Sequence, residues 1–309
     1  MNASKIFLTV FCQLAISVCS MAEDGFAVKQ STDSLAIRFA NEPVAEYVFQ
    51  DAKILRPYFT RIHVPGGMQI TRNHPPIQGK DATDHDTMHP GLWLAFGDIN
   101  GQDFWRNKAV IKHNRFIAPA VVNDGNLTFS TESSLQTSEG KRMGTQISRF
   151  KFSKKSGGYL LIWDVAFLAT EQDLCFGDQE EMGLGVRVST AITEKNGGLI
   201  SSSTGAKGAK ETWGKAHGWC DYSGVIGDAK AGIAIIPDPK NFRPSWFHNR
   251  DYGLMVANPF GRKAMNQGEV SSVVVKKGEE LRLRFAVLFH AEKPSENTDL
   301  NRISGGLWK

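Results

Sequence analysis

The sequence predicts an all-β protein, an antiparallel β-sandwich in which two sheets pack face to face. Three observations favour this class. Apolar and polar residues alternate with a period of two along several segments, Gly- and Asn-containing turns separate these segments at short intervals, and stretches with long helical periodicity are scarce. Many short strands joined by tight turns bury their apolar faces most simply against a second sheet.

The clearest alternation lies in the segment 281–290, which is expected to form a strand with one face in water. Its apolar set is Leu281, Leu283, Phe285, Val287 and Phe289, and its polar set is Arg282, Arg284 and His290. Segment 159–169 differs, because apolar residues occupy both faces and only Asp164 is charged, so this strand should be covered on both sides. Further strands are expected at 27–30, 35–39, 44–49, 109–113, 182–191, 232–236 and 270–276.

Four turn sequences suit hairpins between such strands. They are residues 123–126 (NDGN), 156–158 (SGG), 196–198 (NGG) and 277–279 (KGE). No Pro- or Ser-rich linker and no repeat interrupts the chain. We therefore expect one continuous β-sandwich domain over residues 23–309.

The first 22 residues are typical of a secretory signal peptide. Lys5 precedes an apolar stretch at 6–18, and Ser20 and Ala22 place small residues at the positions that define a cleavage site. Cleavage near Ala22 would leave an exported protein, periplasmic or extracellular. No later stretch is long and uncharged enough to span a bilayer, so an integral membrane protein is not expected.

The charge and the cysteines narrow the class further. The formal net charge is +4, and the basic residues are scattered among acids, so nucleic acid is not an expected partner. After removal of the signal, only Cys175 and Cys220 remain. They are equally consistent with one disulfide and with two small buried thiols.

The best evidence for a functional site is the density of Arg, His, Asp and aromatic residues between Arg56 and Trp105. Such side chains lose hydration when buried and persist there only with partners. Within the segment DHDTMHP, His85 and His89 are candidates for proton transfer. Their spacing also resembles a helical metal pair, but the flanking prolines indicate a loop, so whether a metal is bound stays open.

Two further clusters carry candidate site residues. In the first, Glu181 stands at the entry of an alternating strand that also carries Arg187, and could act as a partner acid or base; Glu180 is at least as consistent with a solvated turn. In the second, aromatic residues interleave with charged ones, as a carbohydrate site requires. The candidates there, together with Trp93 from the first segment, are Trp219, Trp246, His248, Arg250 and Tyr252. For the indoles, the alternative is a core position with a satisfied N–H group.

Seven segments in this order, RPYF, QITRNHPP, DHDTMHPGLW, FGDINGQDFW, EEMGLGVRV, GWCDYSG and WFHNRDYGLMVANPFG, resemble an exported bacterial family labelled "methane oxygenase PmoA". The resemblance implies a β-sandwich similar to the galactose-mutarotase-like supersandwich, in bacteria that often degrade polysaccharides. It implies no catalytic residues. The common histidine motif of that family has a further histidine, and Met88 here departs from it, which weakens a histidine-triplet metal site.

The leading hypothesis is a carbohydrate-active enzyme, a glycoside hydrolase, lyase or epimerase that acts on oligosaccharides, including acidic ones. His85, His89 or His248 would move the proton with Glu181, while four arginines, Arg56, Arg72, Arg187 and Arg250, would hold hydroxyls or a uronate carboxylate. No cofactor is expected, although a divalent metal stays an alternative. The competing hypotheses are a non-catalytic glycan-binding protein and, as the family label suggests, a metal-dependent oxygenase.

Overall fold

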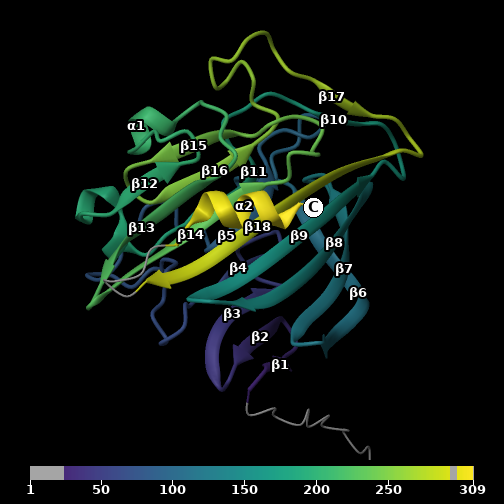
Figure 1. Ribbon diagram of the computed structural model, residues 1–309. Coiled ribbons are helices and arrows are strands. Elements are labelled where there is room, and N and C mark those ends of the chain that lie inside the picture. Colours follow the sequence, from purple (N-terminus) through teal and green to yellow (C-terminus); the bar gives the residue numbers. More distant parts are fainter. Residues whose placement is uncertain (1–23, 293–297, 309) are drawn as a thin grey trace, which may run out of the picture.

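The computed structural model describes residues 24–292 and 298–308, and within these ranges two eight-stranded sheets dominate (Figure 1). The first has the spatial order β1 (Phe26–Gln30), β2 (Ser34–Phe39), β3 (Glu42–Val48), β4 (Tyr58–Thr60), β5 (Leu92–Phe96), β11 (Met182–Arg187), β16 (Leu254–Asn258) and β15 (Trp246–Arg250). The second has the order β12 (Leu199–Ser202), β13 (Cys220–Ile226), β14 (Ala229–Pro237), β18 (Glu280–Glu292), β9 (Gly158–Leu168), β8 (Arg142–Lys155), β7 (Asn126–Gln136) and β6 (Val110–Asn123).

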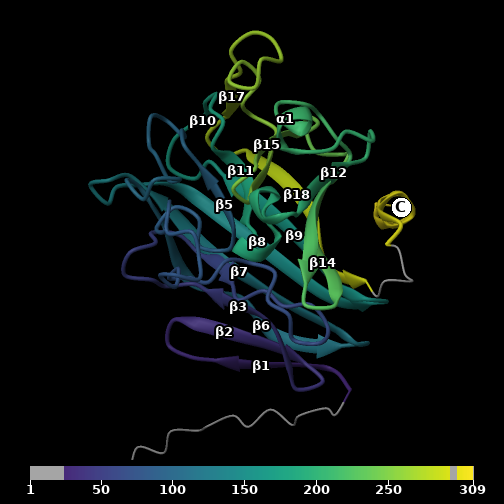
Figure 2. The ribbon, with the colours of Figure 1, turned by 90° about the vertical axis from the view of Figure 1, so that its left-hand side faces the viewer.

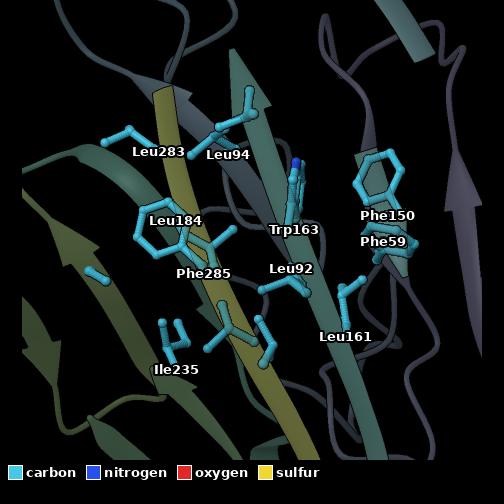
Figure 3. Packing of buried hydrophobic residues seen from close by; sticks show 14 of the residues in the cluster. Phe59, Leu92, Leu94, Phe150, Leu161, Trp163, Leu184, Ile235, Leu283 and Phe285 are labelled. Carbon is cyan, nitrogen blue, oxygen red and sulfur yellow. The ribbon is translucent and has the colours of Figure 1, made fainter. Parts of the chain in front are cut away.

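The two sheets pack against each other around one aromatic and aliphatic core, which confirms the predicted antiparallel sandwich. Figure 3 shows side chains of both sheets interdigitating, among them Phe59 and Leu92 from the first sheet and Trp163 and Phe285 from the second. The rings of Phe59 and Trp163 meet edge to face with their centroids 5.6 Å apart. This geometry favours aromatic pairs because the positive ring edge meets the negative face.

The expected strands agree with this architecture in their cores and differ at their ends. The strand predicted at 182–191 stops at Arg187 and is followed by two 3-10 turns (Thr190–Ile192 and Glu194–Asn196). The segment predicted at 270–276 contributes only β17 (Val273–Val275), which pairs with β10 (Leu174–Phe176). The hairpin turns predicted at 123–126 and 156–158 are confirmed, since they join β6 to β7 and β8 to β9.

The other two predicted hairpins are wrong. Residues 196–198 end the second 3-10 turn and lead into β12, so no strand precedes them. Residues 277–279 join β17 to β18, but β17 pairs with β10 and β18 pairs with β9 and β14. In both places the local sequence does make a turn, and only the long-range pairing decides whether its flanking segments become neighbours.

A C-terminal helix covers part of the second sheet. Besides the one-turn α1 (Ala209–Thr212), the described residues contain the helix α2 (Leu300–Leu307). Asp299 is its N-cap, and the side chain of Asp299 accepts a hydrogen bond from the backbone N–H of Arg302. Figures 1 and 2 show α2 lying outside the second sheet. Its apolar side packs against a cluster that includes Leu160, Trp219 and Leu288. The outward face of β18, predicted to be wet throughout, is therefore buried where this helix lies.

Among the described residues, the two cysteines are both free thiols. Cys220 is buried on β13, and burial raises the pKa of its thiol well above the ordinary value. Cys175 is half-buried on β10. No helix within the described ranges is long and apolar enough to cross a membrane. The predicted signal peptide, residues 1–22, lies outside the described residues.

Candidate functional site

The candidate site lies on the outer face of the first sheet, the face turned away from the core. The strand register aligns His248 of β15, Val256 of β16, Gly185 of β11, Trp93 of β5 and Tyr58 of β4 in one row across this face. Gly185 leaves the space in which the Trp93 indole lies, because a Cβ atom at this position would stand 2.9 Å from that ring. A smaller apolar cluster, which includes Trp93, Trp105 and Leu254, forms the floor.

The loop that carries the histidines closes over this floor through a stack of four rings. Tyr252 stacks on His85 with centroids 5.8 Å apart, His85 on His89 at 4.9 Å, and His89 on Trp93 at 5.1 Å. All three pairs are within 19° of parallel. The stack places His89 inside the protein, whereas His85 lies nearer the surface and its side chain is 41% exposed. Of the two predicted histidines, His85 is therefore the one that a ligand can reach.

Asp84 joins this loop to the sheet. Its carboxylate accepts two hydrogen bonds from the buried Arg187 guanidinium, at 2.7 and 2.9 Å, and lies 2.7 Å from His85 Nδ1. Burial alone would raise the pKa of Asp84, but the hydrogen bonds from Arg187 and His85 and the charges of Arg187 and Arg72 outweigh it and hold this pKa well below its usual range. Because the carboxylate fixes Nδ1 of His85, the Nε2 atom is left to act on a ligand.

His89 is a neutral ring at neutral pH. Burial is the main cause that lowers its pKa well below the ordinary value, and the positive charges of Arg187, Arg72 and Arg56 act in the same direction. Its Nδ1 atom lies 3.4 Å from a guanidinium nitrogen of Arg187, for which it serves as an acceptor. In this position His89 supports the loop and Trp93.

Arg56 and Arg72, both expected to hold a ligand, bind the backbone of the protein instead. Arg72 donates to the carbonyl oxygens of Ala82, Asp84, His85 and His89 at 2.6–3.3 Å. Arg56 donates to the carbonyl oxygens of Met88, Phe104 and Trp105 and to the side chain of Asn107. Both residues are at most 3% exposed. They fix the histidine loop and the loop after β5, and neither guanidinium is free for a substrate.

The acidic cluster reaches the same face with both of its glutamates. Glu180 Oε2 lies 2.9 Å from His248 Nδ1 and 2.8 Å from a guanidinium nitrogen of Arg250. The hydrogen bond from His248 is the largest effect on the Glu180 carboxyl, and with the positive charges of His248 and Arg250 it lowers the pKa despite partial burial. Glu181 instead pairs with Arg106, at 2.9 Å. The sequence analysis favoured Glu181 over Glu180. Two adjacent glutamates look alike in a sequence, and nothing in it shows which one contacts His248.

One donor and one acceptor compete for the same nitrogen of His248. The indole N–H of Trp213 lies 3.3 Å from His248 Nδ1, and the Glu180 carboxylate lies 2.9 Å from the same atom. An indole nitrogen can only donate, so both contacts cannot be full hydrogen bonds to one protonation state. The shorter, charge-assisted contact places the proton on Nδ1, facing Glu180. The His248 side chain is only 4% exposed and Glu180 is 31% exposed, so His248 stands behind the carboxylate as seen from solvent.

The turn between β15 and β16 brings these groups together. It carries Arg250, which binds Glu180, and Tyr252, which stacks on His85 and lies 4.6 Å from the Arg187 guanidinium. Burial is the main cause that raises the pKa of Tyr252; the charges of Arg187 and Arg250 oppose this shift, and those of Asp84 and Glu181 add to it. The three clusters of the sequence therefore meet around this turn.

The remaining predicted residues take separate positions. Trp246 lies on β15, two residues from His248, with the guanidinium of Arg243 5.6 Å from its ring. Trp219 lies against α2 on the second sheet, where its indole N–H donates to Asn301 at 3.0 Å, so it is not part of this site. Arg106 was missed because nothing in its local sequence marks it, and Trp213, which begins the cluster of interleaved aromatic and charged residues, was not chosen as a candidate. Among the described residues, no three His, Cys, Asp or Glu side chains gather to hold a metal ion.

Comparisons with solved structures find distant likenesses. A galactose mutarotase-like protein from Clostridium acetobutylicum is similar at a TM-score of 0.41 and 8% identity, covering 88% of this chain and 100% of that one. A galactose mutarotase related enzyme from Lactobacillus acidophilus has a TM-score of 0.32 at 8% identity, with the same coverage. A TPR-domain containing protein from Parabacteroides distasonis reaches 0.40 at 9% identity over 86% of this chain, which spans 49% of that protein's length.

Among the curated proteins no relative matches the chain. The resemblance to the family labelled "methane oxygenase PmoA" is wrong, because the family model that matches carries no such label and describes a family of unknown function. The short motifs that suggested the resemblance correspond to the loops and strands of the site described above, and these motifs alone do not identify a family. The match extends over residues 34–303 and so includes the site, the second sheet and the first sheet except β1. The chain belongs to the family of unknown function DUF6807.

Proposed function

We propose that this protein is a carbohydrate-active enzyme whose outer face on the first sheet transfers protons to and from a sugar. The observation that carries the proposal is the pairing of two oriented proton-transfer groups around one turn. His85 is fixed by Asp84, Glu180 is backed by His248, and the turn from Arg250 to Tyr252 contacts both groups.

The roles follow from exposure and hydrogen bonding. Glu180 is held ionised by His248 and Arg250, which suits a general base. His85 is exposed and keeps Nε2 available, which suits the acid that completes the transfer. A hydrolase of the two-carboxylate type needs a protonated carboxyl group beside an ionised one, and Asp84, Glu180 and Glu181 are each paired with an arginine, which favours the ionised form. This favours an epimerase or a lyase over a hydrolase.

The rim can contact a sugar ring through one aromatic side chain, the half-buried Tyr252, and charged groups surround it. Trp93 and Trp105 are at most 1% exposed, so Trp93, predicted to contact the substrate, supports the site from below instead. Arg187 and Arg250 already bind Asp84 and Glu180, so their charges are balanced within the protein. The proposal therefore does not require an acidic substrate.

The test combines a panel of oligosaccharides with His85→Asn and Glu180→Gln. Epimerisation is followed by nuclear magnetic resonance, elimination by the ultraviolet absorbance of an unsaturated product, and hydrolysis by new reducing ends. Each variant should lower kcat/KM by about 10²–10⁴-fold. His63→Asn and Glu171→Gln, which lie outside the site, serve as matched controls. Wild-type turnover in both site variants would refute the assigned roles.

A non-catalytic glycan-binding protein is the second candidate. It is favoured by one observation, namely that the carboxylates of Asp84, Glu180 and Glu181 are each paired with an arginine, which gives a fixed polar surface. In that case the panel would show affinity without any product. His85→Asn would then weaken binding and change no rate.

Export is also part of the proposal. It rests on the N-terminal pattern at residues 1–22 alone. Mass spectrometry of the protein recovered from the periplasmic or extracellular fraction should find a mature N-terminus near Glu23. A chain that retains Met1 in the cytoplasm would contradict export.

A further inference from the structure

A cavity lies on the same face of the first sheet as the candidate site, next to the histidine loop. Its volume is about 680 Å³, within the range of small-molecule sites, and its floor consists of the outward residues of β2, β3 and β4. Asp84 and His85 belong to the candidate site, and Asp86 and Thr87, the next two residues, line this cavity. The loop thus contributes to the candidate site and to this cavity.

The cavity contains a polar side chain that lacks a partner. Thr60 is 3% exposed, lies opposite Glu46 on the outward face of β4, and its hydroxyl has no hydrogen-bond partner among the described residues. The Nδ1 atom of His74, which also lines the cavity, is buried without a partner as well. Buried polar groups are rarely left unsatisfied, so these two atoms indicate an occupant that can donate and accept hydrogen bonds.

The charges restrict what this occupant can be. Asp33, Glu46, Asp51 and Asp86 line the cavity against only two cationic side chains, Lys53 and Arg61. Arg61 already binds Glu46 at 2.9 Å. Asp51 accepts hydrogen bonds from the backbone of Lys53 and Ile54 and from the Tyr58 hydroxyl, and its pKa is lowered. A carboxylate or phosphate would therefore be repelled, whereas hydroxyl and amine groups would be accepted.

We propose that this cavity binds a sugar unit without negative charge, neutral or amine-bearing, that belongs to the ligand handled across the loop. The inference rests on the proposed function and adds the substrate class: the oligosaccharide carries a non-acidic unit next to the reacting one. Recognition here is by hydrogen bonds, since Tyr58 is buried under its bond to Asp51 and offers no stacking surface.

The test uses Thr60→Val and Asp86→Asn, with Thr128→Val and Asp124→Asn on the second sheet as matched controls. The probes are oligosaccharides of glucose, galactose, mannose, xylose and glucosamine, with galacturonate and glucuronate as acidic counterparts, and binding is measured by calorimetry. A non-acidic probe should bind, and each cavity variant should weaken it about tenfold. Thr60→Val removes a hydroxyl without a partner, so it should keep the unfolding temperature of the wild type.

The outcomes separate the inference from the proposed function. If a non-acidic probe binds as tightly to Thr60→Val and Asp86→Asn as to the wild type, while His85→Asn loses turnover, the cavity proposal is overturned and the proposed function stands. Preferential binding of an acidic probe, strengthened by Asp86→Asn, also overturns it. Loss of affinity in the cavity variants together with full turnover in His85→Asn and Glu180→Gln supports the cavity and refutes the catalytic roles.

Discussion

Replacing Asp84 by Asn should destabilise the protein, because it removes the anionic partner of a buried arginine. Arg187 is 1% exposed and both of its terminal nitrogens donate to Asp84. Breaking a buried ion pair costs about 3–5 kcal/mol, and exposed pairs are worth about 0–1 kcal/mol. The Asp84 side chain is 40% exposed, so the cost should lie between these limits, at about 2 kcal/mol. For a chain of this size that lowers the unfolding temperature by roughly 5 °C.

The pH dependence gives this prediction its sign. The pKa of Asp84 is lower in the folded protein than in the unfolded chain, where an aspartate titrates near about 4. The stabilisation by Asp84 is therefore complete above that value and is lost as the pH falls below it. The difference in unfolding free energy between wild type and Asp84→Asn should be constant at neutral pH and should shrink on acidification below pH ~4.

Denaturant unfolding at a series of pH values measures both quantities. Asp164→Asn is the matched control, because Asp164 also accepts two hydrogen bonds from one guanidinium, that of Arg282, but this arginine is 54% exposed. The control should cost at most about 1 kcal/mol. If Asp84→Asn costs no more than Asp164→Asn, or if its deficit persists unchanged in acid, the burial of Arg187 does not strengthen its ion pair with Asp84.

Three further predictions concern the floor, the buried histidine and the C-terminal helix. Gly185→Ala would bring a Cβ atom to 2.9 Å from the ring of Trp93, so it should cost about 1–3 kcal/mol in thermal unfolding; an unchanged unfolding temperature would show that the indole can move away. The pKa of His89 is lowered in the folded protein, so its contribution to the free energy of unfolding should diminish as the pH falls below 6.5, where the histidine of the unfolded chain takes up a proton. His89→Gln should therefore flatten the pH dependence of stability in this range. A titration of His89 near 6.5 in the folded protein would contradict this prediction. Leu300→Ala should loosen α2 from the second sheet and raise the hydrogen exchange of its amides and of the Trp219 indole, while exchange in the first sheet stays constant.

Local patterns were sufficient wherever one short-range cause determined the structure. The alternation at 281–289 predicts which residues of β18 face the core, and Leu283, Phe285, Val287 and Phe289 do so. The apolar residues on both faces of 159–169 predict a covered strand, and β9 has the main core on one side and the α2 cluster on part of the other. The turn at 123–126 needs only its own residues to join two neighbouring strands.

Long-range pairing was not accessible in this way. The segments of the first sheet come from residues 26–96, 182–187 and 246–258, and nothing local states that β5 lies beside β11. The same limit explains the wrong hairpin at 277–279, whose flanking strands find partners elsewhere. It also explains why Arg56 and Arg72 were wrongly expected to bind a ligand. A sequence shows that an arginine is present, but it does not show that carbonyl oxygens of distant loops surround the guanidinium.

By itself, the sequence determined the class of the fold and the chemical types that gather at the site, since periodicity and composition act through neighbours along the chain. Only the tertiary structure decided which of those side chains meet. Glu180, not Glu181, contacts His248, because the chain entering β11 brings Glu180 to β15 and Glu181 to Arg106. His85 is reachable and His89 is enclosed because a ring stack on Trp93 fixes their depth, and this stack is complete only when the distant turn with Tyr252 meets the histidine loop.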